Sequence, residues 1–462
     1  MTNTHAQPET QSQFGTPAHH SPQRLKAARS DALKGHSKIP GDKSMSHRAL
    51  MFGALAIGET IISGLLEGED VIHTAQAMQA LGAQIEKGKD GLWRVHGVGI
   101  GGLREPQGVL EMGNSGTSTR LLIGLIAAHD ITATFSGDAS LSKRPMQRVI
   151  TPLEMMGASF QSRDGGRLPL TVKGAHSALN IEYRLPVASA QVKSAILLAG
   201  LNAAGRTTVI EEKPTRDHTE NMLKHFGVEV TTETLEDGAL AVSVIGHQTM
   251  QPCAIDVPGD PSSAAFPAVA AAIQEGSDIY LAHIGLNPRR IGIFDCLREM
   301  GADIQYKNQR IEGGEPVADI HIRSTGQLKG ITVPESRVPS MIDEFPVFAM
   351  AASCADGVTK MTGLEELRVK ESDRLAMIAK GLEACGVKLE MGADSLTIHG
   401  NGKPPKGGAT IETALDHRIA MAFLVLGGVS DEPIAIDDAA PIRTSFPNFT
   451  ALMNDLGCAI AD

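Results

Sequence analysis

The chain has 462 residues, a formal net charge of -11 and only 3% aromatic residues. This length accommodates two or three domains, each large enough to bury a hydrophobic core. The acidic balance and the scarcity of aromatic rings argue against a nucleic-acid binder, which needs a basic face for a duplex or stacking rings for a single strand. An anionic small-molecule substrate would require a local cluster of Lys and Arg that overrides the global charge.

Cysteine and histidine spacing indicates the compartment. The five cysteines lie far apart and form no CxxC pair, and the histidines show no metal-binding motif. Free thiols are therefore expected in a reducing compartment, so we expect a cytoplasmic protein without a structural metal. There is no apolar run of membrane-spanning length and no apolar core of a secretory signal. Polar residues dominate the start of the chain, and residues 1–35 are predicted to be a disordered tail.

A short sequence motif, apolar–Gly–small–x–apolar, occurs six times, each time at the end of a segment with a helical pattern. Its glycines recur roughly every 75 residues, at Gly82, Gly157, Gly227, Gly301, Gly386 and Gly457. Such a glycine can end a helix in the left-handed conformation, with a strand following. The fixed period predicts a repeated supersecondary unit, and the six units divide into three plus three near residues 257–260.

Each unit also begins with a run that is apolar on nearly every side, as in residues 120–128, 193–204, 263–273 and 417–429. A helix with this pattern is buried. An amphipathic helix then leads to the glycine. We therefore predict an α/β protein of two similar domains, with buried parallel helices inside and sheets around them. The alternative is an ordinary α/β enzyme with coincidental phrases, which six regular recurrences disfavour.

Polar loops precede the buried helices, in residues 41–48, 113–120, 188–193, 259–263, 340–344 and 416–418. Helix N-termini attract anions, glycine lets the backbone approach a phosphate, and Ser and Thr add hydroxyl donors. Lys43, Arg48, Arg120 and Arg418 would add full charges. Capping alone explains any single loop, but the six together favour a polyanionic substrate.

Charged residues also stand near the starts of the amphipathic helices, in residues 142–145, 215–217 and 367–374. Lys370 and Arg374 are four residues apart, so they are expected to share a helical face, and Glu371 precedes Arg374 by three. A face of mixed charge is usually solvated surface. Its density, and its place at the same end of the unit as the anion loops, favour the substrate site.

Five strings resemble 5-enolpyruvylshikimate-3-phosphate synthases, most closely the bacterial class II branch. They are GDKSMSHR at 41–48, GNSGT at 113–117, SMIDE at 340–344, LRVKESDR at 367–374 and LDHRIAM at 415–421. The resemblance implies the enolpyruvyl transferase fold, an inside-out α/β barrel in which each of two domains contains three βαβαββ repeats. One domain would combine residues 36–40 with 259–462, the other would span 41–258, and the active site would lie in the cleft between them.

The resemblance also implies a reaction. Enzymes of this family transfer the enolpyruvyl group of phosphoenolpyruvate to the 5-hydroxyl of shikimate 3-phosphate and release phosphate, in the shikimate pathway to chorismate and aromatic amino acids. No cofactor is required. Neither nucleic acid nor membrane is an expected partner, and a monomer is expected.

The matching motifs imply the site residues. Shikimate 3-phosphate would contact Lys43, Ser44, Arg48, Ser189, Ala190, Gln191, Arg216, Asp343 and Lys370. Phosphoenolpyruvate would contact Lys43, Gly116, Arg144, Gln191, Arg374 and Arg418. Asp343 would accept the 5-hydroxyl proton, Glu371 would exchange a proton at C3 of phosphoenolpyruvate, and Lys43 would assist phosphate departure. In the alternative interpretation, Glu371 has no catalytic role and is only an ion-pair partner of Arg374 or Lys370.

Three positions bear on specificity. Thr444 stands where another branch of the family has a lysine, and the neighbouring Arg443 could substitute for it. Ala190 replaces a Ser common in the family, so one hydroxyl contact is missing. Gly116 matches the glycine at which a methyl group excludes the herbicide glyphosate, so glyphosate sensitivity is expected.

Two rival functions differ in class. UDP-N-acetylglucosamine enolpyruvyl transferases share the fold, but they have a loop cysteine and Lys-Asn after the first loop, whereas Ser44 follows Lys43 here and no anion loop contains Cys. A non-catalytic anion-binding module would explain the six repeats. It would not explain why Lys43, Asp343 and Glu371 occur at the same ends of the units.

Overall fold

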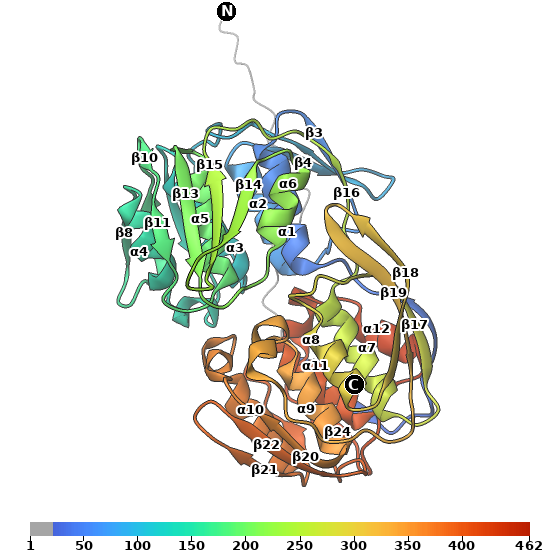
Figure 1. Cartoon of the computed structure of the whole chain (residues 1–462). Coiled ribbons are helices and arrows are strands. Elements are labelled where there is room, and N and C mark those ends of the chain that lie inside the picture. The colour runs from blue at the N-terminus through green and yellow to red at the C-terminus, as the bar shows by residue number, and fades with distance from the viewer. Residues whose placement is uncertain (1–21) are drawn as a thin grey trace, which may run out of the picture.

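The computed structural model describes residues 22–462, which form two lobes (Figure 1). Each lobe has its own large hydrophobic core. One core is built from residues between Met45 and Val257, and we call this part the N-lobe. The other combines Leu25, Leu33 and Ile39 with residues from Ala264 to Ile460, and we call it the C-lobe. The predicted boundaries near residues 41 and 258 stay a prediction, which the two separate cores support.

Helices alternate between buried and amphipathic along the described chain, as the sequence predicts. The buried helices are α1 (Lys43–Leu55), α3 (Gly116–Ala127), α5 (Ala190–Gly200), α7 (Pro261–Ile273), α9 (Phe345–Cys354) and α11 (His417–Gly427). The amphipathic helices are α2 (Glu69–Ala80), α4 (Gln147–Met155), α6 (His218–His225), α8 (Gly292–Glu299), α10 (Arg374–Ala384) and α12 (Phe449–Asp455). Short 3-10 helices are η1 (Leu141–Lys143), η2 (Glu335–Ser340), η3 (Glu365–Val369) and η4 (Ala440–Thr444).

The six glycines after the amphipathic helices all adopt the left-handed conformation. Their φ angles lie between 81° at Gly227 and 113° at Gly457. A residue with a Cβ is strained at such angles, so glycine is favoured at each of these helix ends. The predicted role of the repeated phrase is confirmed.

Sheets of the N-lobe share one topology. The strand orders are β16 (Ala254–Asp256), β3 (Glu59–Ser63), β5 (Trp93–His96), β4 (Gln84–Lys87); β6 (Leu110–Glu111), β7 (Thr132–Ser136), β9 (Arg167–Lys173), β8 (Ser159–Arg163); and β11 (Glu182–Arg184), β13 (Arg206–Glu211), β15 (Leu240–Ile245), β14 (Val230–Thr234). In each sheet the first pair is parallel and the other pairs are antiparallel. A further small sheet pairs β10 (Ala178–Leu179) with β12 (Ala203–Ala204).

Sheets of the C-lobe repeat this pattern with one shorter member. The orders are β2 (Lys34–Lys38), β17 (Asp278–Gly285), β19 (Glu315–Arg323), β18 (Asp303–Glu312); β20 (Asp356–Met361), β22 (Leu396–Asn401), β21 (Lys388–Met391); and β23 (Thr410–Ile411), β24 (Ile434–Ile436), β1 (Leu25–Ala28), β25 (Ala459–Ala461). The predicted α/β repeat architecture is therefore confirmed. Within residues 22–462, no helix is both long and apolar enough to cross a membrane.

The ordered chain begins earlier than predicted. Strand β1 lies between β24 and β25, and its Leu25 and Ala27 are buried in the C-lobe core. The predicted tail of residues 1–35 therefore extends too far, because a four-residue strand among polar neighbours leaves too short a pattern to recognise. Residues 1–21 of that tail lie outside the described residues.

The chain passes between the lobes twice, at residues 40–42 and 258–260. The two crossover segments pair with each other, because Asp42 N donates to Pro258 O at 2.7 Å and Asp260 N donates to Pro40 O at 2.9 Å. Helices α1 and α7 begin directly after these segments. The N-termini of two buried helices, one from each lobe, are thereby fixed side by side.

Candidate active site

The loops before the buried helices contain capping residues as well as charged ones. Asp42, Ser115, Ser189, Asp260 and Asp416 each accept a hydrogen bond from a backbone N–H in the first turn of the following helix. A side chain at this place satisfies one of the four free N–H groups of a helix. Capping therefore accompanies the proposed anion-binding role and does not exclude it.

Asp343, just before α9, lies at the centre of a cationic group. Its Oδ1 is 3.0 Å from Arg374 Nη1 and 3.3 Å from Lys370 Nζ, and its Oδ2 accepts from Arg216 Nη2 at 2.7 Å. Burial raises the pKa of Asp343, but Lys370, Arg216, Arg418 and Arg374 hold this pKa well below its usual range. The side chain is therefore an ionised carboxylate.

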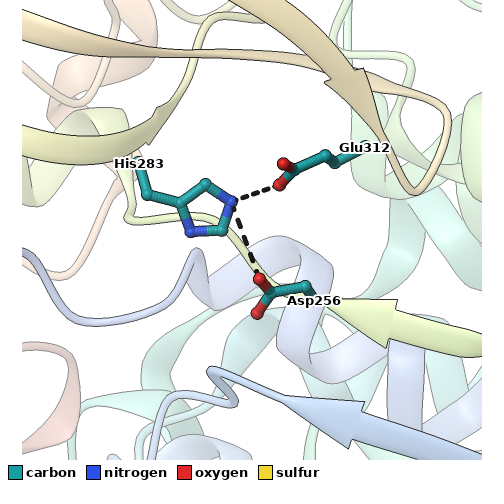
Figure 2. A group of neighbouring side chains, drawn as sticks. All are labelled: Asp256, His283 and Glu312. Atoms are coloured by element: carbon teal, nitrogen blue, oxygen red, sulfur yellow. Dashed lines mark hydrogen bonds and ion pairs between the residues drawn. The ribbon is translucent and has the colours of Figure 1, made fainter. Parts of the chain in front are cut away.

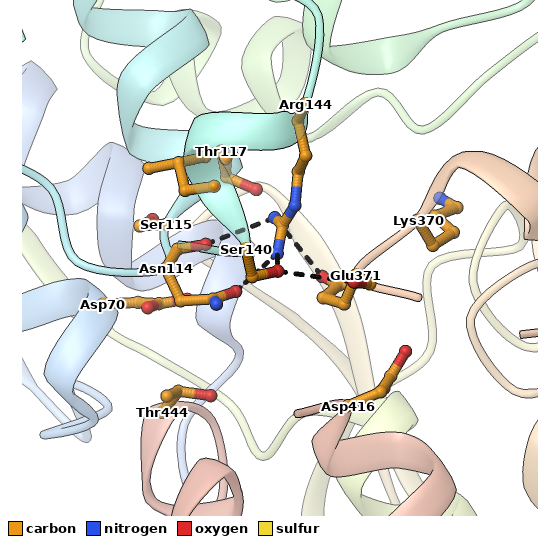
Figure 3. A network of polar contacts seen from close by, with 12 residues as sticks. Asp70, Asn114, Ser115, Thr117, Ser140, Arg144, Lys370, Glu371, Asp416 and Thr444 are labelled. Atoms are coloured by element: carbon orange, nitrogen blue, oxygen red, sulfur yellow. Dashed lines mark hydrogen bonds and ion pairs between the residues drawn. The ribbon is translucent and has the colours of Figure 1, made fainter. Parts of the chain in front are cut away.

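Glu371 lies beside this group and reaches the other lobe. Its carboxylate accepts from Arg374 Nη2 at 2.5 Å. It is also 3.9 Å from Arg144 Nη1 (Figure 3). Burial raises the pKa of Glu371, whereas Arg374, Arg144 and His417 lower it, and the result is well below the usual range. The ion pair with Arg374 is present, as the alternative interpretation of Glu371 without a catalytic role requires. It is compatible with a catalytic role, because the same arginine is predicted to bind substrate.

Arg374 is the first residue of α10 and is buried. Its Nε donates to Asp416 Oδ2 at 2.8 Å, and Asp416 also accepts from Ser372 Oγ at 3.0 Å. Arg418 Nη1 donates to the backbone oxygen of Asp343 at 3.1 Å. The starts of three C-lobe helices, α9, α10 and α11, therefore converge. Sequence reasoning did not identify Asp416, although its capping position two residues before Arg418 was a usable signal.

Lys370 and Arg374 do not share a helical face, so that prediction is wrong. The 3-10 helix η3 ends at Val369, and α10 begins only at Arg374. Lys370 has φ -79° and ψ -150°, which is not helical. The two side chains meet at Asp343 because the intervening loop turns them toward it, which a spacing of four residues cannot reveal.

On the N-lobe side, Lys43 and Arg144 are held by neutral and acidic partners. Lys43 Nζ forms an ion pair with Asp70 on α2. Arg144 Nη2 donates to Asn114 Oδ1 at 2.5 Å and to Ser140 Oγ at 3.1 Å (Figure 3). Neither Asp70 nor Asn114 was predicted from the sequence, since each acts through a residue of another segment.

Gln191 is part of a second N-lobe chain of hydrogen bonds. Its Oε1 accepts from Arg120 Nη1 at 2.8 Å, and its Nε2 donates to Thr117 Oγ1 at 2.9 Å. Ser189 and Ala190, at the start of the same helix α5, are half-buried. The first turns of α3 and α5 therefore lie next to each other with polar groups between them.

Arg48 points into the N-lobe. Its Nε donates to Thr219 Oγ1 at 2.7 Å, its Nη2 to Ser194 Oγ at 2.9 Å and its Nη1 to Ser44 O at 3.0 Å. Burial lowers the pKa of Arg48 to about 10. These bonds join α1 to α5 and α6, so in this structure Arg48 holds the half-buried Ser44 in place. Direct binding of a substrate by Arg48 stays a prediction.

A cavity of about 390 Å³ lies between the two lobes, beside Arg144 and Glu371. Its N-lobe wall is formed by residues of the segment 139–145, including Arg144, and its C-lobe wall by residues of 368–373 with Ala414 and Leu415. Lys370 and Glu371 both line it. The cavity can accept a small anion, because cations from both walls face it.

Comparison with known proteins identifies the family. Residues 27–453 match the model of EPSP synthase (3-phosphoshikimate 1-carboxyvinyltransferase). The chain belongs to the EPSP synthase family. A 3-phosphoshikimate 1-carboxyvinyltransferase of Parvibaculum lavamentivorans is 58% identical over 446 residues, which are 96% of this chain and 99% of that protein.

Solved structures agree with this assignment. The EPSP synthase of Acinetobacter baumannii has a TM-score of 0.84 and 47% identity, covering 95% of this chain and 100% of that one. The enolpyruvyl transferase NikO of Streptomyces tendae, with a TM-score of 0.72 and 16% identity, covers 96% of this chain and 99% of that one, and this likeness concerns the fold alone. The predicted family and the predicted enolpyruvyl transferase fold are confirmed.

Gly116, which the sequence associates with glyphosate in EPSP synthases, is the first residue of α3. A Cβ added here would lie 2.9 Å from Arg120 Nη1 and 3.1 Å from Arg144 Nη1. A methyl group would therefore press on two guanidinium groups, one of which, that of Arg144, is predicted to bind phosphoenolpyruvate. In the last loop, Arg443 is exposed and the Thr444 hydroxyl donates to Pro441 O at 2.8 Å.

Among residues 22–462, one group of side chains has ligand atoms close enough to hold a metal ion. It consists of Asp256, His283 and Glu312, whose ligand atoms lie within 4.8 Å of one another (Figure 2). His283 Nε2 is 2.5 Å from Glu312 Oε2 and 3.9 Å from Asp256 Oδ2. Sequence spacing could not predict this group, because its members come from three strands. None of the three belongs to the residues predicted for an EPSP synthase site, and Glu312 also pairs with Arg310.

Proposed function

We propose that this chain transfers the enolpyruvyl group of phosphoenolpyruvate to the 5-hydroxyl of shikimate 3-phosphate, with Asp343, Glu371 and Lys43 as its catalytic residues. The observation that carries the proposal is the convergence of Arg216, Lys370 and Arg374 on Asp343 at the meeting of the lobes, in a member of the EPSP synthase family. The site combines one base with a set of cations that suits two anionic substrates.

Substrate binding exchanges internal ion pairs for external ones. In the structure, Arg216 pairs with Asp343 across the lobes, and Arg144 approaches Glu371 across the lobes. The phosphate and carboxylate groups of the substrates compete for these guanidinium groups. Shikimate 3-phosphate is held by Arg216, Lys370, Ser44, Ser189, Gln191 and the Ala190 backbone, and phosphoenolpyruvate by Arg144, Arg374, Arg418, Gln191 and the space at Gly116.

The exchange also prepares the two acids. Burial raises the pKa of Glu371 and the charges of Arg374 and Arg144 lower it, so substrate anions that take up these charges favour the protonated group. Asp343 keeps Lys370 beside it and stays ionised. The environment thus separates an acid from a base.

In the addition step, the 5-hydroxyl oxygen attacks C2 of phosphoenolpyruvate and gives its proton to Asp343, while Glu371 delivers a proton to C3. A tetrahedral ketal phosphate results. In the elimination step, C3 returns its proton to Glu371, the C2–C3 double bond re-forms and the C–O bond to phosphate breaks. The departing phosphate takes up the proton held by Asp343. Lys43, released from Asp70, stabilises the departing phosphate.

The rival functions are less well supported. The comparisons favour 3-phosphoshikimate 1-carboxyvinyltransferase over the nucleotide-sugar enolpyruvyl transferase, and an enzyme over a binding module. A cytoplasmic location and a monomeric state complete the proposal. The location draws support from the five free cysteines.

A phosphate-release assay with both substrates tests the function. Wild type should release phosphate only when shikimate 3-phosphate and phosphoenolpyruvate are both present, and Asp343→Ala should lower kcat by roughly 10² to 10⁴. Asp237→Ala is the matched control, because Asp237 pairs with Arg184 on the exposed surface. Phosphate release with UDP-N-acetylglucosamine in place of shikimate 3-phosphate would instead support the rival transferase.

A further inference from the structure

A buried arginine joins the two crossover segments. Arg290, in the loop between β17 and α8, is 2% exposed. Its Nη1 donates to Asp42 Oδ2 at 3.0 Å, and its Nη2 donates to Asp260 Oδ1 at 2.8 Å. Asp42 caps α1 of the N-lobe and Asp260 caps α7 of the C-lobe. One guanidinium group therefore holds the capping residues of two helices from different lobes.

The same guanidinium holds a third helix. Arg290 Nη1 donates to His218 Nε2 at 2.9 Å, and His218 is the first residue of α6. Because arginine can only donate, Nε2 of His218 is an acceptor and its Nδ1 carries the hydrogen. This Nδ1–H then donates to the buried Glu315 Oε1 at 2.8 Å. The imidazole orientation and tautomer are thereby fixed from the C-lobe.

The neighbouring Arg289 holds the residues on either side of Arg216. Its Nη1 donates to Thr215 O at 2.6 Å, and its Nε is 3.3 Å from Asp217 Oδ2. Asn287, in the same loop, donates to Asp217 Oδ1 at 2.7 Å. The loop 287–290 of the C-lobe therefore fixes the N-lobe loop that carries Arg216.

The two N-lobe segments held in this way have one thing in common. The segment after Asp42 carries Lys43 and Ser44, and the segment before His218 carries Arg216. All three are proposed contacts of shikimate 3-phosphate. The arginines proposed for phosphoenolpyruvate have other partners: Asn114 for Arg144, Asp416 for Arg374 and the Asp343 backbone for Arg418.

We propose that Arg290, assisted by Arg289, is a positioning residue for shikimate 3-phosphate, which holds the binding segments 42–44 and 215–218 of the N-lobe from the C-lobe. The inference rests on the proposed function and deepens it. The bidentate geometry is essential, because a lysine ammonium cannot span Asp42, Asp260 and Ser262 at once. The pair acts on one substrate more than on the other, although Lys43 is shared.

Arg290→Lys tests the inference, because the charge is kept and the fork is lost. We expect the KM for shikimate 3-phosphate, and its Kd by calorimetry, to rise roughly tenfold, with a KM for phosphoenolpyruvate within about twofold of wild type. A purely structural role would lower the melting temperature and the active fraction and leave both KM values unchanged. Arg298→Lys is the control, since Arg298 lies on the next helix and contacts Asp295 and the Ile304 backbone.

Arg289→Lys keeps the inference falsifiable if Arg290→Lys does not fold, because the Arg289 side chain is 28% exposed. The same selective rise should appear, smaller in size. Equal changes in both KM values, or none in either variant, overturn the inference. A wild type that binds shikimate 3-phosphate yet releases no phosphate would count against the proposed function instead, and the binding measurement on the variants would still decide the positioning role.

Discussion

The two lobes touch through ion pairs in two regions that differ in burial. On the crossover side, the side chains of Arg290 and its partners Asp42 and Asp260 are between 2% and 7% exposed. On the cleft side, Arg216 is 18% exposed, its partner Asp343 is 13% exposed, and Glu371 is 21% exposed. Ion pairs between the lobes are therefore permanent on the crossover side and exchangeable on the cleft side.

Solvent access explains the difference. A fully buried pair cannot be replaced by a ligand, and removing one partner leaves an uncompensated charge. A partly exposed arginine can exchange its carboxylate partner for a substrate phosphate, because its guanidinium stays neutralised and Asp343 keeps Lys370 and Arg374 beside it. The buried ion pairs at the crossover therefore fix how the two lobes are placed, and the ion pairs at the cleft respond to substrate.

The largest effect on stability is expected from the buried ion pairs at the crossover. Asp260→Asn removes one of the two carboxylates facing Arg290 and should lower the free energy of unfolding by about 3 kcal/mol, the low end for a broken buried pair, because Asp42 remains. Urea unfolding measures this. Asp303→Asn is the control, since Asp303 pairs with Arg323 on the surface and should change stability by less than about 1 kcal/mol. Equal losses in both variants would remove the distinction between the two regions.

Neutralising a cleft carboxylate should affect catalysis more than stability. Glu371→Gln keeps the shape but cannot exchange a proton, so we expect kcat to fall by about 10² or more. The free energy of unfolding should fall by less than in Asp260→Asn, because Asp343 and Asp416 still neutralise Arg374. Wild type in deuterated water should exchange deuterium into C3 of phosphoenolpyruvate, and the variant should not.

Glu366→Gln provides the matched control for this change. Glu366 also pairs across the lobes, with Arg148 at 2.9 Å, but it is not among the lining residues of the cavity. A Glu371→Gln enzyme with normal turnover and normal exchange would return Glu371 to the role of an ion-pair partner.

Acid should weaken the folded state through buried histidines near the cations. Burial, with Lys43 and Arg48, lowers the pKa of His47 well below 6.5, and burial, with Arg418 and Lys43, lowers that of His417. Below pH 6.5 the unfolded chain binds protons that the folded chain does not. Stability should therefore be complete above this pH and fall below it, by up to about 1.4 kcal/mol per pH unit for each histidine.

Urea unfolding between pH 7.5 and 5.5 measures this slope. His47→Gln should reduce it, and His176→Gln, which changes an imidazole that is 87% exposed, should leave it unchanged. Identical slopes in all three proteins would contradict the assignment of the pH dependence to buried imidazoles.

The smallest effect is expected from a methyl group at the cleft. Gly116→Ala should displace Arg120 and Arg144 by a few tenths of an ångström, and overpacking of about 1–3 kcal/mol corresponds to a roughly tenfold higher KM for phosphoenolpyruvate. Inhibition by glyphosate should weaken at the same time. Gly108→Ala is the control, because a Cβ there meets nothing within 4 Å. Unchanged inhibition in Gly116→Ala would place the inhibitor elsewhere.

Local patterns explain how much of this could be predicted. The apolar runs and the glycine caps are properties of consecutive residues, so the six helix pairs followed from them. Asp343, Glu371 and Arg374 come together because all three stand at helix starts, and the repeats place these starts at one end. A strand as short as β1 carries too little pattern to be recognised.

The partners of the cationic residues could not be predicted. Asp70 holds Lys43, and Arg290 meets Asp42 although the two are 248 positions apart. Such pairs depend on how segments far apart in the sequence pack against each other, which no local pattern records. The wrong expectation for Lys370 has the same origin, since it assumed a helix where the chain forms a loop.

The position of β1 has a consequence for biosynthesis. This strand pairs with β24 and β25, so its partners leave the ribosome after all the described strands of the N-lobe. At about 5–20 residues per second, β1 waits for roughly 20–80 s with its edges unpaired, while the N-lobe core can already form. The few, partly polar residues of β1 limit the risk that it pairs with another nascent chain during this delay.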